Sequence, residues 1–442
     1  MQGRNQFPNL FLNIISRVAT AALAIAILFT LTVVLSPLTQ GQSPAVNRVR
    51  GERILHNFNE QQDGAFPEAK LIFDGAGNLY GTALAGGVNE GGTAFELSPS
   101  AGGTWTWQVL HAFGNDTDGN SPFAALIFDA AGNLYSTTSG GGAYGLGTVF
   151  ELVSTGGEGW TEQVLYNFSN SADGADPESA LVFDGAGNLY GTTAFYLNST
   201  VFELTLTSGG SWTEHTLYNF ADGVLAAKGS LIFDAAGNLY GSTGAGGEYG
   251  GGSVFELSPG AGGHWTWQVL HDFGNDADGN SPSAGVIMDA AGNLYGTTAG
   301  GGAYTGGTVF ELSPAAGGGW TEQILYSFAN IPDGSTPYAC LTFDSAGNLY
   351  GTTYYGGIYG GGTVFELSPV AGGGWTEQVL HSFGNGTDGS GPSADVILDS
   401  AGNIYGTTAY GGTYNCPPFG CGVVFEVTNV APCANCSHAD LR

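Results

Sequence analysis

The stretch Gly132-Asn133-Leu134-Tyr135-Ser136-Thr137-Thr138 decides the fold of this chain of 442 residues, because near copies of it recur along the sequence at a nearly fixed period. The six other copies begin at Gly77, Gly187, Gly237, Gly292, Gly347 and Gly402. Successive copies are 55, 55, 50, 55, 55 and 55 residues apart. A constant period of this size is typical of a repeat architecture in which each copy is one supersecondary unit.

Each unit contains four runs that have the composition of β-strands. In the second unit they read ALIFD (125–129), NLYSTT (133–138), TVFEL (148–152) and WTEQVLYNF (160–168). The runs are short, rich in β-branched and aromatic residues, and bounded by turn-forming residues. Seven units of four strands predict an all-β fold, a seven-bladed β-propeller.

The two ends of the array predict that the ring is closed. The run Arg53–Phe58 matches the end of the Trp-bearing strand, yet it precedes the first complete unit. The last unit has no Trp-bearing run after Val427. We therefore expect the N-terminal strand to complete the last blade, which removes the exposed edges that template aggregation.

The first 50 residues predict export. Residues 1–17 contain Arg4 and Arg17 and no acid, and Val18–Leu35 is a predominantly apolar run that contains no charged residue. We interpret residues 1–42 as a signal peptide, with an uncleaved membrane anchor as the open alternative because the apolar run reaches the lower limit for a span. A linker (43–50), the propeller (51–428) and a Cys-containing tail (429–442) follow. Membrane contact is expected only through the N-terminal apolar segment, if that segment is uncleaved.

The charge of the chain excludes two classes of partner. Its formal net charge is −30, and the repeats contain only three basic residues, Arg53, Lys70 and Lys228. Nucleic acids and anionic membrane surfaces would be repelled by such a surface.

Four of the five cysteines are expected to form local disulfides. Cys416 and Cys421 flank a four-residue insertion, and Cys433 and Cys436 lie in the tail. Disulfides fit an exported protein, whereas the Cys416 to Cys421 spacing is wrong for a usual zinc knuckle. Cys340 is interpreted as a small buried hydrophobe.

The whole 55-residue unit resembles the GloVer tandem repeat, over roughly residues 50–428. The resemblance is carried by Pro337–Asp344, the stretch 346–353 reading AGNLYGTT, and Gly362–Pro369. It implies an exported bacterial protein of uncharacterised activity. The tail lacks the C-terminal anchor of some members of that family. The Asp-x-Ala-Gly-Asn turn is also similar to that of NHL-type propellers, which implies that the ALIFD strand lines the axis.

Polar residues that recur in every unit are interpreted as parts of the scaffold. An Asp before x-Ala-Gly-Asn bonds its own tight turn. The Glu of VFEL is solvated or bonded by a neighbouring blade, and the His or Tyr near the end of the outer strand is a flat ring with a polar tip. The turn Asp residues are Asp74, Asp129, Asp184, Asp234, Asp289, Asp344 and Asp399.

Calcium stays open at two loops only. The sequence Asn-Asp-x-Asp-Gly occurs at Asp116 and Asp118 and again at Asp276 and Asp278. Counted from Asp116, position 12 is Ile127, where a calcium loop of the EF-hand type requires a bidentate Glu. A simple Asp-Gly turn explains the loops, so we expect no metal site and no cofactor.

Functional residues are expected where the units differ. Two positions vary between units: the residue three before the first Leu or Val of the ALIFD strand and the residue directly before it. The position between them is always Ala, Ser or Gly. By strand alternation the two variable positions share one face, which we predict looks into the channel. The candidate ligand-binding residues at this channel mouth are Glu68, Lys70, Phe123, Glu178, Lys228, Tyr338 and Asp395. We predict that Lys228 adjoins Glu178 and that Lys70 adjoins Asp395 across the point of closure.

Two function classes follow from these residues. The preferred hypothesis is an exported, non-catalytic scaffold that binds a glycan, peptide or protein at the channel mouth. The alternative is an extracytoplasmic hydrolase or lyase that uses Glu68 and Glu178 as a carboxylate pair. The channel positions hold no His and the chain has no Gly-x-Ser-x-Gly elbow, so no catalytic residue is assigned.

Overall fold

The computed structural model describes the protein between residues 50 and 429. Within that range it leaves out Asp116, Glu158, Asp276, Asn330, Pro418 and residues 170–172, 195–198, 221–223 and 225–228. The predicted signal peptide or anchor, Lys228, Asp116, Asp276, Cys433 and Cys436 therefore lie outside the described residues. Within the described range no helix is long and apolar enough to span a bilayer.

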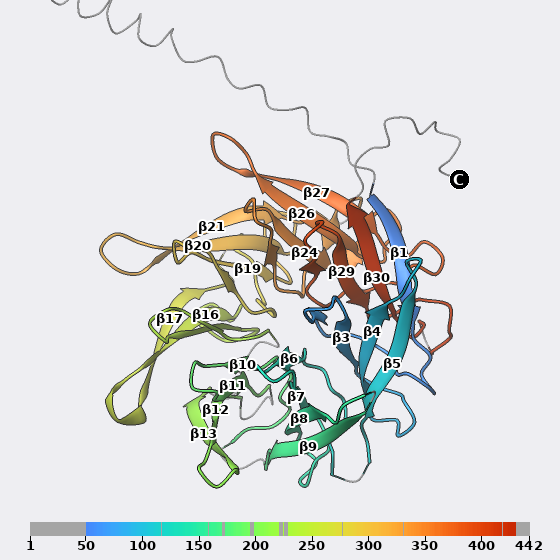
Figure 1. Cartoon of the computed structure of the whole chain (residues 1–442). Coiled ribbons are helices and arrows are strands. Elements are labelled where there is room, and N and C mark those ends of the chain that lie inside the picture. The colour runs from blue at the N-terminus through green and yellow to red at the C-terminus, as the bar shows by residue number, and fades with distance from the viewer. Residues whose placement is uncertain are drawn as a thin grey trace, which may run out of the picture. The chain divides into compact units, whose positions relative to one another are not determined.

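Seven antiparallel four-stranded sheets are arranged around a central axis, which confirms the predicted seven-bladed propeller (Figure 1). The innermost strands are β2 (Ile72–Phe73), β6 (Ile127–Phe128), β10 (Val182–Phe183), β14 (Ile232–Phe233), β18 (Ile287–Met288), β23 (Thr342–Phe343) and β28 (Ile397–Leu398). The second strands are β3 (Leu79–Ala83), β7 (Leu134–Thr138), β11 (Leu189–Thr192), β15 (Leu239–Thr243), β19 (Leu294–Thr298), β24 (Leu349–Thr353) and β29 (Ile404–Thr408).

The two outer positions of each blade are taken by longer strands. The third strands are β4 (Thr93–Pro99), β8 (Thr148–Ser154), β12 (Thr200–Leu206), β16 (Ser253–Pro259), β20 (Thr308–Pro314), β26 (Thr363–Pro369) and β30 (Val423–Asn429). The outermost strands are β5 (Trp105–Ala112), β9 (Trp160–Asn167), β13 (Trp212–Asn219), β17 (Trp265–Asp272), β21 (Trp320–Ser327), β27 (Trp375–Ser382) and β1 (Arg50–Asn57). A short pair, β22 (Gly334–Ser335) with β25 (Tyr355–Gly356), and one 3-10 turn, Ala261–Gly263, complete the described elements.

The N-terminal strand closes the ring, as predicted. β1 pairs with β30 in an antiparallel register that sets Gly51 opposite Thr428 and Asn57 opposite Val423 (Figure 1). The Arg53 guanidinium also bonds the Glu426 carboxylate across this pair. Blade 7 is therefore built from β28, β29, β30 and β1. The last strand of the chain, β30, pairs with the first strand, β1.

The turn between the first two strands has the same spacing in every unit because the hydrogen bonds of its Asp hold it. Asp344 Oδ1 accepts the backbone N–H groups of Ala346 and Asn348 at 2.8 and 2.9 Å, and its Oδ2 accepts from the Asn348 amide at 2.8 Å and the Tyr350 hydroxyl at 3.3 Å. Gly347 has a φ of 86°, which a residue with a Cβ adopts only at a cost. The prediction that these Asp residues are structural is confirmed.

The Glu of each VFEL run takes its hydrogen bonds from its own blade. The Tyr135 hydroxyl donates to Glu151 at 2.6 Å, and the Ser98 hydroxyl donates to Glu96 at 2.7 Å. The expectation that neighbouring blades supply the donors is therefore wrong for these residues, because a side chain on the adjacent strand (Tyr135) or on the same strand (Ser98) lies within reach.

The apolar core lies between adjacent blades. The cluster between blades 1 and 2 joins Phe113 of the first to Leu134 and Phe150 of the second, all fully buried. In six of the seven blades the ring of the third-strand Phe lies over a Gly of the second strand, and Ser136 takes that position in blade 2. A Cβ added to Gly81 would lie 2.6 Å from Phe95 Cζ, so the ring packs closely against the glycine there.

Hydroxyl groups of the second strands also join neighbouring blades. Each donates to a backbone carbonyl just before the innermost strand of the next blade, at distances between 2.5 and 3.4 Å. These bonds run from Thr82 to Ala124, Thr137 to Pro177, Ser242 to Ala284, Thr297 to Ala339, Thr352 to Ala394 and Thr407 to Ala69. The last one crosses the point of closure. They hold in place the segments that border the axis.

Candidate functional site

A cavity of about 600 Å³ lies on the axis of the ring and is bordered by all seven blades. Six of the seven sequence-predicted positions line it, and the seventh, Lys228, lies outside the described residues. We call these six the channel-mouth residues: Glu68, Lys70, Phe123, Glu178, Tyr338 and Asp395.

The backbone that presents these side chains is not itself in a strand. Residues 68–71 precede β2 and have no strand conformation, and the same holds in the other blades. The small residues between the variable positions, such as Ala69 and Ala124, border the cavity too. The prediction that strand alternation separates the two sets is therefore wrong, although the variable residues do reach the axis.

An ion pair closes the cavity wall between the first and last blades. Lys70 Nζ lies 3.5 Å from Asp395 Oδ2, which confirms that these two residues are neighbours across the closure. Asp395 Oδ1 accepts the backbone N–H of Cys340 at 2.7 Å, so its carboxylate spans three blades. Burial and the nearby Asp395 raise the pKa of the Cys340 thiol, which is unoxidised and buried as expected. The predicted contact between Lys228 and Glu178 lies outside the described residues.

Aromatic side chains gather on one side of the cavity. Tyr354 contacts the rings of Tyr338, Tyr355 and Tyr410 at centroid distances of 5.5, 4.7 and 6.5 Å. All four rings line the cavity, and Tyr338 and Tyr355 are 40% and 55% exposed. Phe123 lines it as well, from blade 2.

Sequence reasoning missed Tyr354, Tyr355 and Tyr410. They follow the second strands of blades 6 and 7, where blades 2, 4 and 5 have only small residues such as Ser139 and Gly244. The channel-mouth residues were selected because ligand-binding residues are expected where the units differ. The same criterion, applied to this loop, would have selected these three tyrosines.

The other charged side chains that line the cavity, among the described residues, are the acidic Glu68 and Glu178. Burial and the nearby Glu178 raise the pKa of Asp176, which lies two residues before Glu178 in the chain, above its ordinary value. Burial, a hydrogen bond with Tyr410 and the charge of Glu68 raise the pKa of the Tyr354 hydroxyl, so it stays protonated at neutral pH and can donate. Among the described residues, Lys70 is the only Lys or Arg that lines the cavity.

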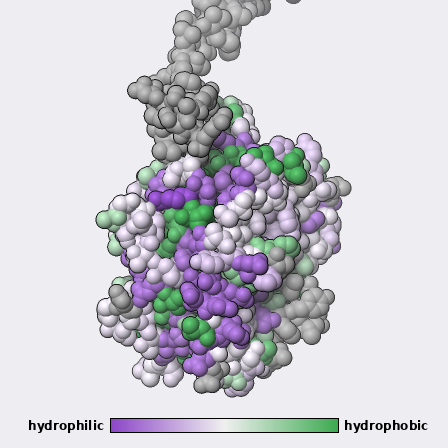
Figure 2. All heavy atoms as spheres, turned by 90° about the vertical axis from the view of Figure 1, so that its right-hand side faces the viewer, coloured by the Kyte–Doolittle hydropathy of each residue, from purple (hydrophilic) through white to green (hydrophobic). Residues whose placement is uncertain are grey.

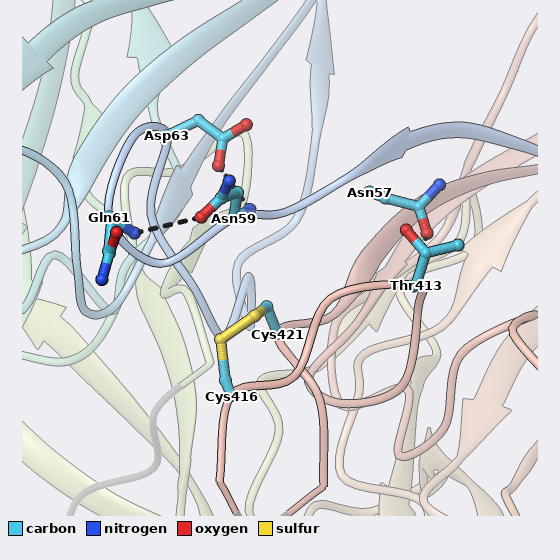
Figure 3. Close-up of a disulfide and its surroundings, with 7 residues drawn as sticks. All are labelled: Asn57, Asn59, Gln61, Asp63, Thr413, Cys416 and Cys421. Atoms are coloured by element: carbon cyan, nitrogen blue, oxygen red, sulfur yellow. Dashed lines mark hydrogen bonds between the residues drawn. A yellow bond between two sulfur atoms is a disulfide. The ribbon is translucent and has the colours of Figure 1, made fainter.

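The insertion of blade 7 packs beside the aromatic side of the cavity. Cys416 and Cys421 form the predicted disulfide, with their Cα atoms 4.9 Å apart (Figure 3). The Cys421 carbonyl accepts the backbone N–H of Phe66 at 2.9 Å. Tyr410 contacts the rings of Phe66 and Phe419 at 5.7 and 5.8 Å, so the insertion holds one wall of the cavity.

The Asp-Gly loops lie on the same face of the ring as the cavity. Bridges such as Ser390 to Tyr410 pair these loops with the loops that line the cavity. Asp118 accepts from the His111 imidazole at 3.1 Å and from the backbone N–H of Asn115 at 2.9 Å. No group of three or more candidate metal ligands occurs within the described part of the chain. Calcium at Asp116 and Asp276 concerns residues that are not described, so it stays an untested alternative.

Comparison with known proteins places this geometry in a family and a fold. The sequence pattern described as the Gloeobacter/Verrucomicrobia repeat matches residues 45–229 and 194–417. No curated protein matches the sequence.

Several solved structures share the fold. Virginiamycin B lyase from Staphylococcus aureus is 11% identical, with a TM-score of 0.50 over 86% of this chain and 98% of its own. A protein from Lactobacillus plantarum is 16% identical, with a TM-score of 0.52 over 79% of this chain and 98% of its own. Hydrazine synthase from Kuenenia stuttgartiensis is 15% identical, with a TM-score of 0.51 over 84% of this chain and 96% of that chain. At these identities the likeness concerns the fold alone, because propellers host unrelated functions.

Proposed function

The chain belongs to the Gloeobacter/Verrucomicrobia repeat family, and we propose that this member is an extracytoplasmic, non-catalytic scaffold that binds the end of a glycan chain at the channel-mouth residues. One observation carries the proposal. Aromatic rings and hydrogen-bonding groups converge on one side of the axial cavity, around Tyr338, Tyr354 and Lys70.

The chemistry of the cavity favours a polar ligand without net negative charge. Flat rings offer a surface for the apolar face of a sugar, and a few placed polar groups fix its orientation. Glu68 and Asp395 supply acceptors for hydroxyl groups, and Lys70 supplies a donor. The volume of about 600 Å³ is within the range of small-molecule sites. Peptide and protein ligands are outcomes that the test below separates from glycans.

The compartment is part of the proposal. The Cys416 to Cys421 disulfide is of a kind that persists in oxidising compartments. Together with the export signal predicted in residues 1–42 it supports a location outside the cytoplasm.

A second candidate function is that of a hydrolase or lyase. It is favoured by one observation, that Glu68 and Glu178 line the same cavity. In that case the two carboxylates would act as an acid and base pair on a glycosidic bond.

Titration calorimetry against neutral oligosaccharides and a mixed peptide library, with chromatography of the same mixtures for products, tests both functions. The scaffold predicts saturable binding of an oligosaccharide without product, weakened at least tenfold by Phe123→Ala or Tyr338→Ala. The enzyme predicts turnover that Glu68→Gln or Glu178→Gln abolishes. If all four variants behave as the unchanged protein in both measurements, the channel-mouth assignment is wrong.

A further inference from the structure

Five of the seven blades carry a tyrosine at the same loop position, and the fold makes no use of its ring. These residues are Tyr144, Tyr249, Tyr304, Tyr359 and Tyr414. Their exposed fractions are 65%, 49%, 62%, 51% and 49%. Repeated residues of the core and of the turns are accounted for by packing or hydrogen bonds, but a repeated exposed ring is not. We call these five residues the rim tyrosines.

The loops that carry the rim tyrosines are held firmly by their backbones. In each, the N–H of a Gly donates to the carbonyl of a Gly earlier in the same loop, as from Gly307 to Gly301 at 3.1 Å and from Gly362 to Gly356 at 3.1 Å. The same bond occurs in the other three loops at 2.9 to 3.2 Å. The ring at the loop tip is therefore presented on a fixed backbone, and binding costs little conformational entropy.

Polar groups of the outermost strand lie beside three of the rim tyrosines, and at Tyr359 those of the Asp-Gly loop do so as well. Tyr359 borders a groove of about 320 Å³ that is also lined by His381, Asn385 and Asp388. Burial, Asp173 and Glu214 raise the pKa of the Tyr166 hydroxyl, and Tyr144 contributes in the same direction, so Tyr144 lies near Tyr166. Tyr304 has the same relation to Tyr326.

We propose that the rim tyrosines are a multivalent binding surface for a neutral polysaccharide, distinct from the channel-mouth residues. A ligand that meets the same ring five times has repeating chemistry, as a polysaccharide does. Each ring offers a face for one sugar, and polar groups beside it bond the sugar hydroxyls, as the Asn385 amide, the His381 imidazole and the Asp388 carboxylate would at Tyr359.

Charge and surface pattern favour this ligand over others. The formal net charge of −30 disfavours acidic polysaccharides, and the described loops around the rim tyrosines contain no Lys or Arg. A protein partner would need a contiguous interface of about 1,000 Å² or more. On the side of the ring shown in Figure 2, apolar side chains form small patches separated by polar ones. Isolated rings suit separate sugar residues better than such an interface.

The test measures retention of the purified protein on insoluble cellulose, chitin and starch, with immobilised polylysine and alginate as charged comparisons. Changing all five rim tyrosines to Ala is expected to lower the apparent affinity for the neutral polysaccharide about 100-fold, because linked weak sites gain 10²–10⁴-fold in avidity. Changing all five to Phe keeps the ring faces and is expected to retain most of the binding. A single Tyr359→Ala change is expected to have only a few-fold effect.

Circular dichroism and thermal unfolding check that the variants fold, which the exposure of the five side chains predicts. Val370→Ala, which changes an exposed apolar side chain in the β26–β27 hairpin that lines neither the cavity nor the groove at Tyr359, is the matched control and should leave retention unchanged. Retention that is lost with Tyr338→Ala but kept in the five-Ala variant would overturn this inference and leave the proposed function standing. Retention on none of the three neutral polysaccharides, or on polylysine alone, would also overturn it.

Discussion

Glutamates buried between the blades predict that the ring is more stable in mild acid than at alkaline pH. Glu162, Glu322 and Glu377 occupy the same position in the outermost strands β9, β21 and β27. Their Oε1 atoms are buried and make no hydrogen bond to the described protein groups. Burial, with a nearby Asp adding to it, raises the pKa of each carboxyl to about 7.

The neighbouring groups come from the preceding blade in each case. Asp118 acts on Glu162 and Asp278 acts on Glu322, and each of these Asp residues is paired with a His, at 3.1 Å for His111 and 3.5 Å for His271. Asp333, which bonds the Tyr326 hydroxyl at 3.0 Å, acts on Glu377.

The sign of the effect follows from proton binding. A pKa raised from 4.5 to about 7 means that the folded state binds more protons than the unfolded state between these two values. The stabilisation is full below pH 4.5 and is lost as the pH rises through 7. The shift corresponds to about 3 kcal/mol at 1.36 kcal/mol per pKa unit. Because the side chains are only half-buried, we expect about 1 kcal/mol for each Glu.

The perturbation is the triple change of Glu162, Glu322 and Glu377 to Gln, a neutral side chain of the same shape. We expect it to raise the free energy of unfolding by about 3 kcal/mol at pH 8 and by only about 1 kcal/mol at pH 5. Urea unfolding followed by tryptophan fluorescence at the two pH values measures it. The exposed Glu248→Gln is the control and should change neither value. A triple variant that is destabilised at pH 8, or equally affected at both pH values, would refute the reasoning.

Three further changes test the scaffold by the same unfolding measurement. Thr407→Val removes the bond to the Ala69 carbonyl at the closure and is expected to cost about 1–3 kcal/mol, with Thr407→Ser retaining most of it. Asp344→Ala removes four turn bonds and is expected to cost about 2–3 kcal/mol, and Asp344→Asn less, whereas an equal loss in both would contradict the turn geometry. Replacing Cys416 and Cys421 by Ser opens a short loop and is expected to cost about 2 kcal/mol. Reduction of the unchanged protein should cost the same amount, and a larger loss in the Ser variant than on reduction would contradict the assignment of the effect to the disulfide.

The fold was predictable from the sequence because each blade repeats the same solution. The period, the turn Asp and the displaced strand Arg53–Phe58 depend on local spacing, and spacing is visible in a sequence. The alternation argument for the channel failed for a local reason. Residues such as Glu68 and Lys70 precede the strand instead of lying in it. A strand of two residues does not impose the alternation of its side chains on the residues before it.

The parts that sequence reasoning missed depend on contacts between units. Tyr354 and Tyr410 reach the axis from loops whose path depends on the neighbouring blade. The exposure of the rim tyrosines is likewise a property of the assembled ring, since the sequence of a Gly-rich loop does not show whether its Tyr is buried or exposed. The raised pKa of Glu162 arises from its burial and, in addition, from the charge of Asp118 in the preceding blade, and both depend on the assembled ring.

The measurement that tests the central claim most directly is a crystal structure of the ring with an oligosaccharide that it binds in the calorimetric panel. The account predicts electron density for a sugar in the axial cavity, with one sugar face on the ring of Tyr338 or Tyr354 and hydroxyls within hydrogen-bond distance of Glu68, Lys70 or Asp395. Density confined to the outer strands or to the opposite face of the ring, with the cavity filled only by solvent, would contradict it.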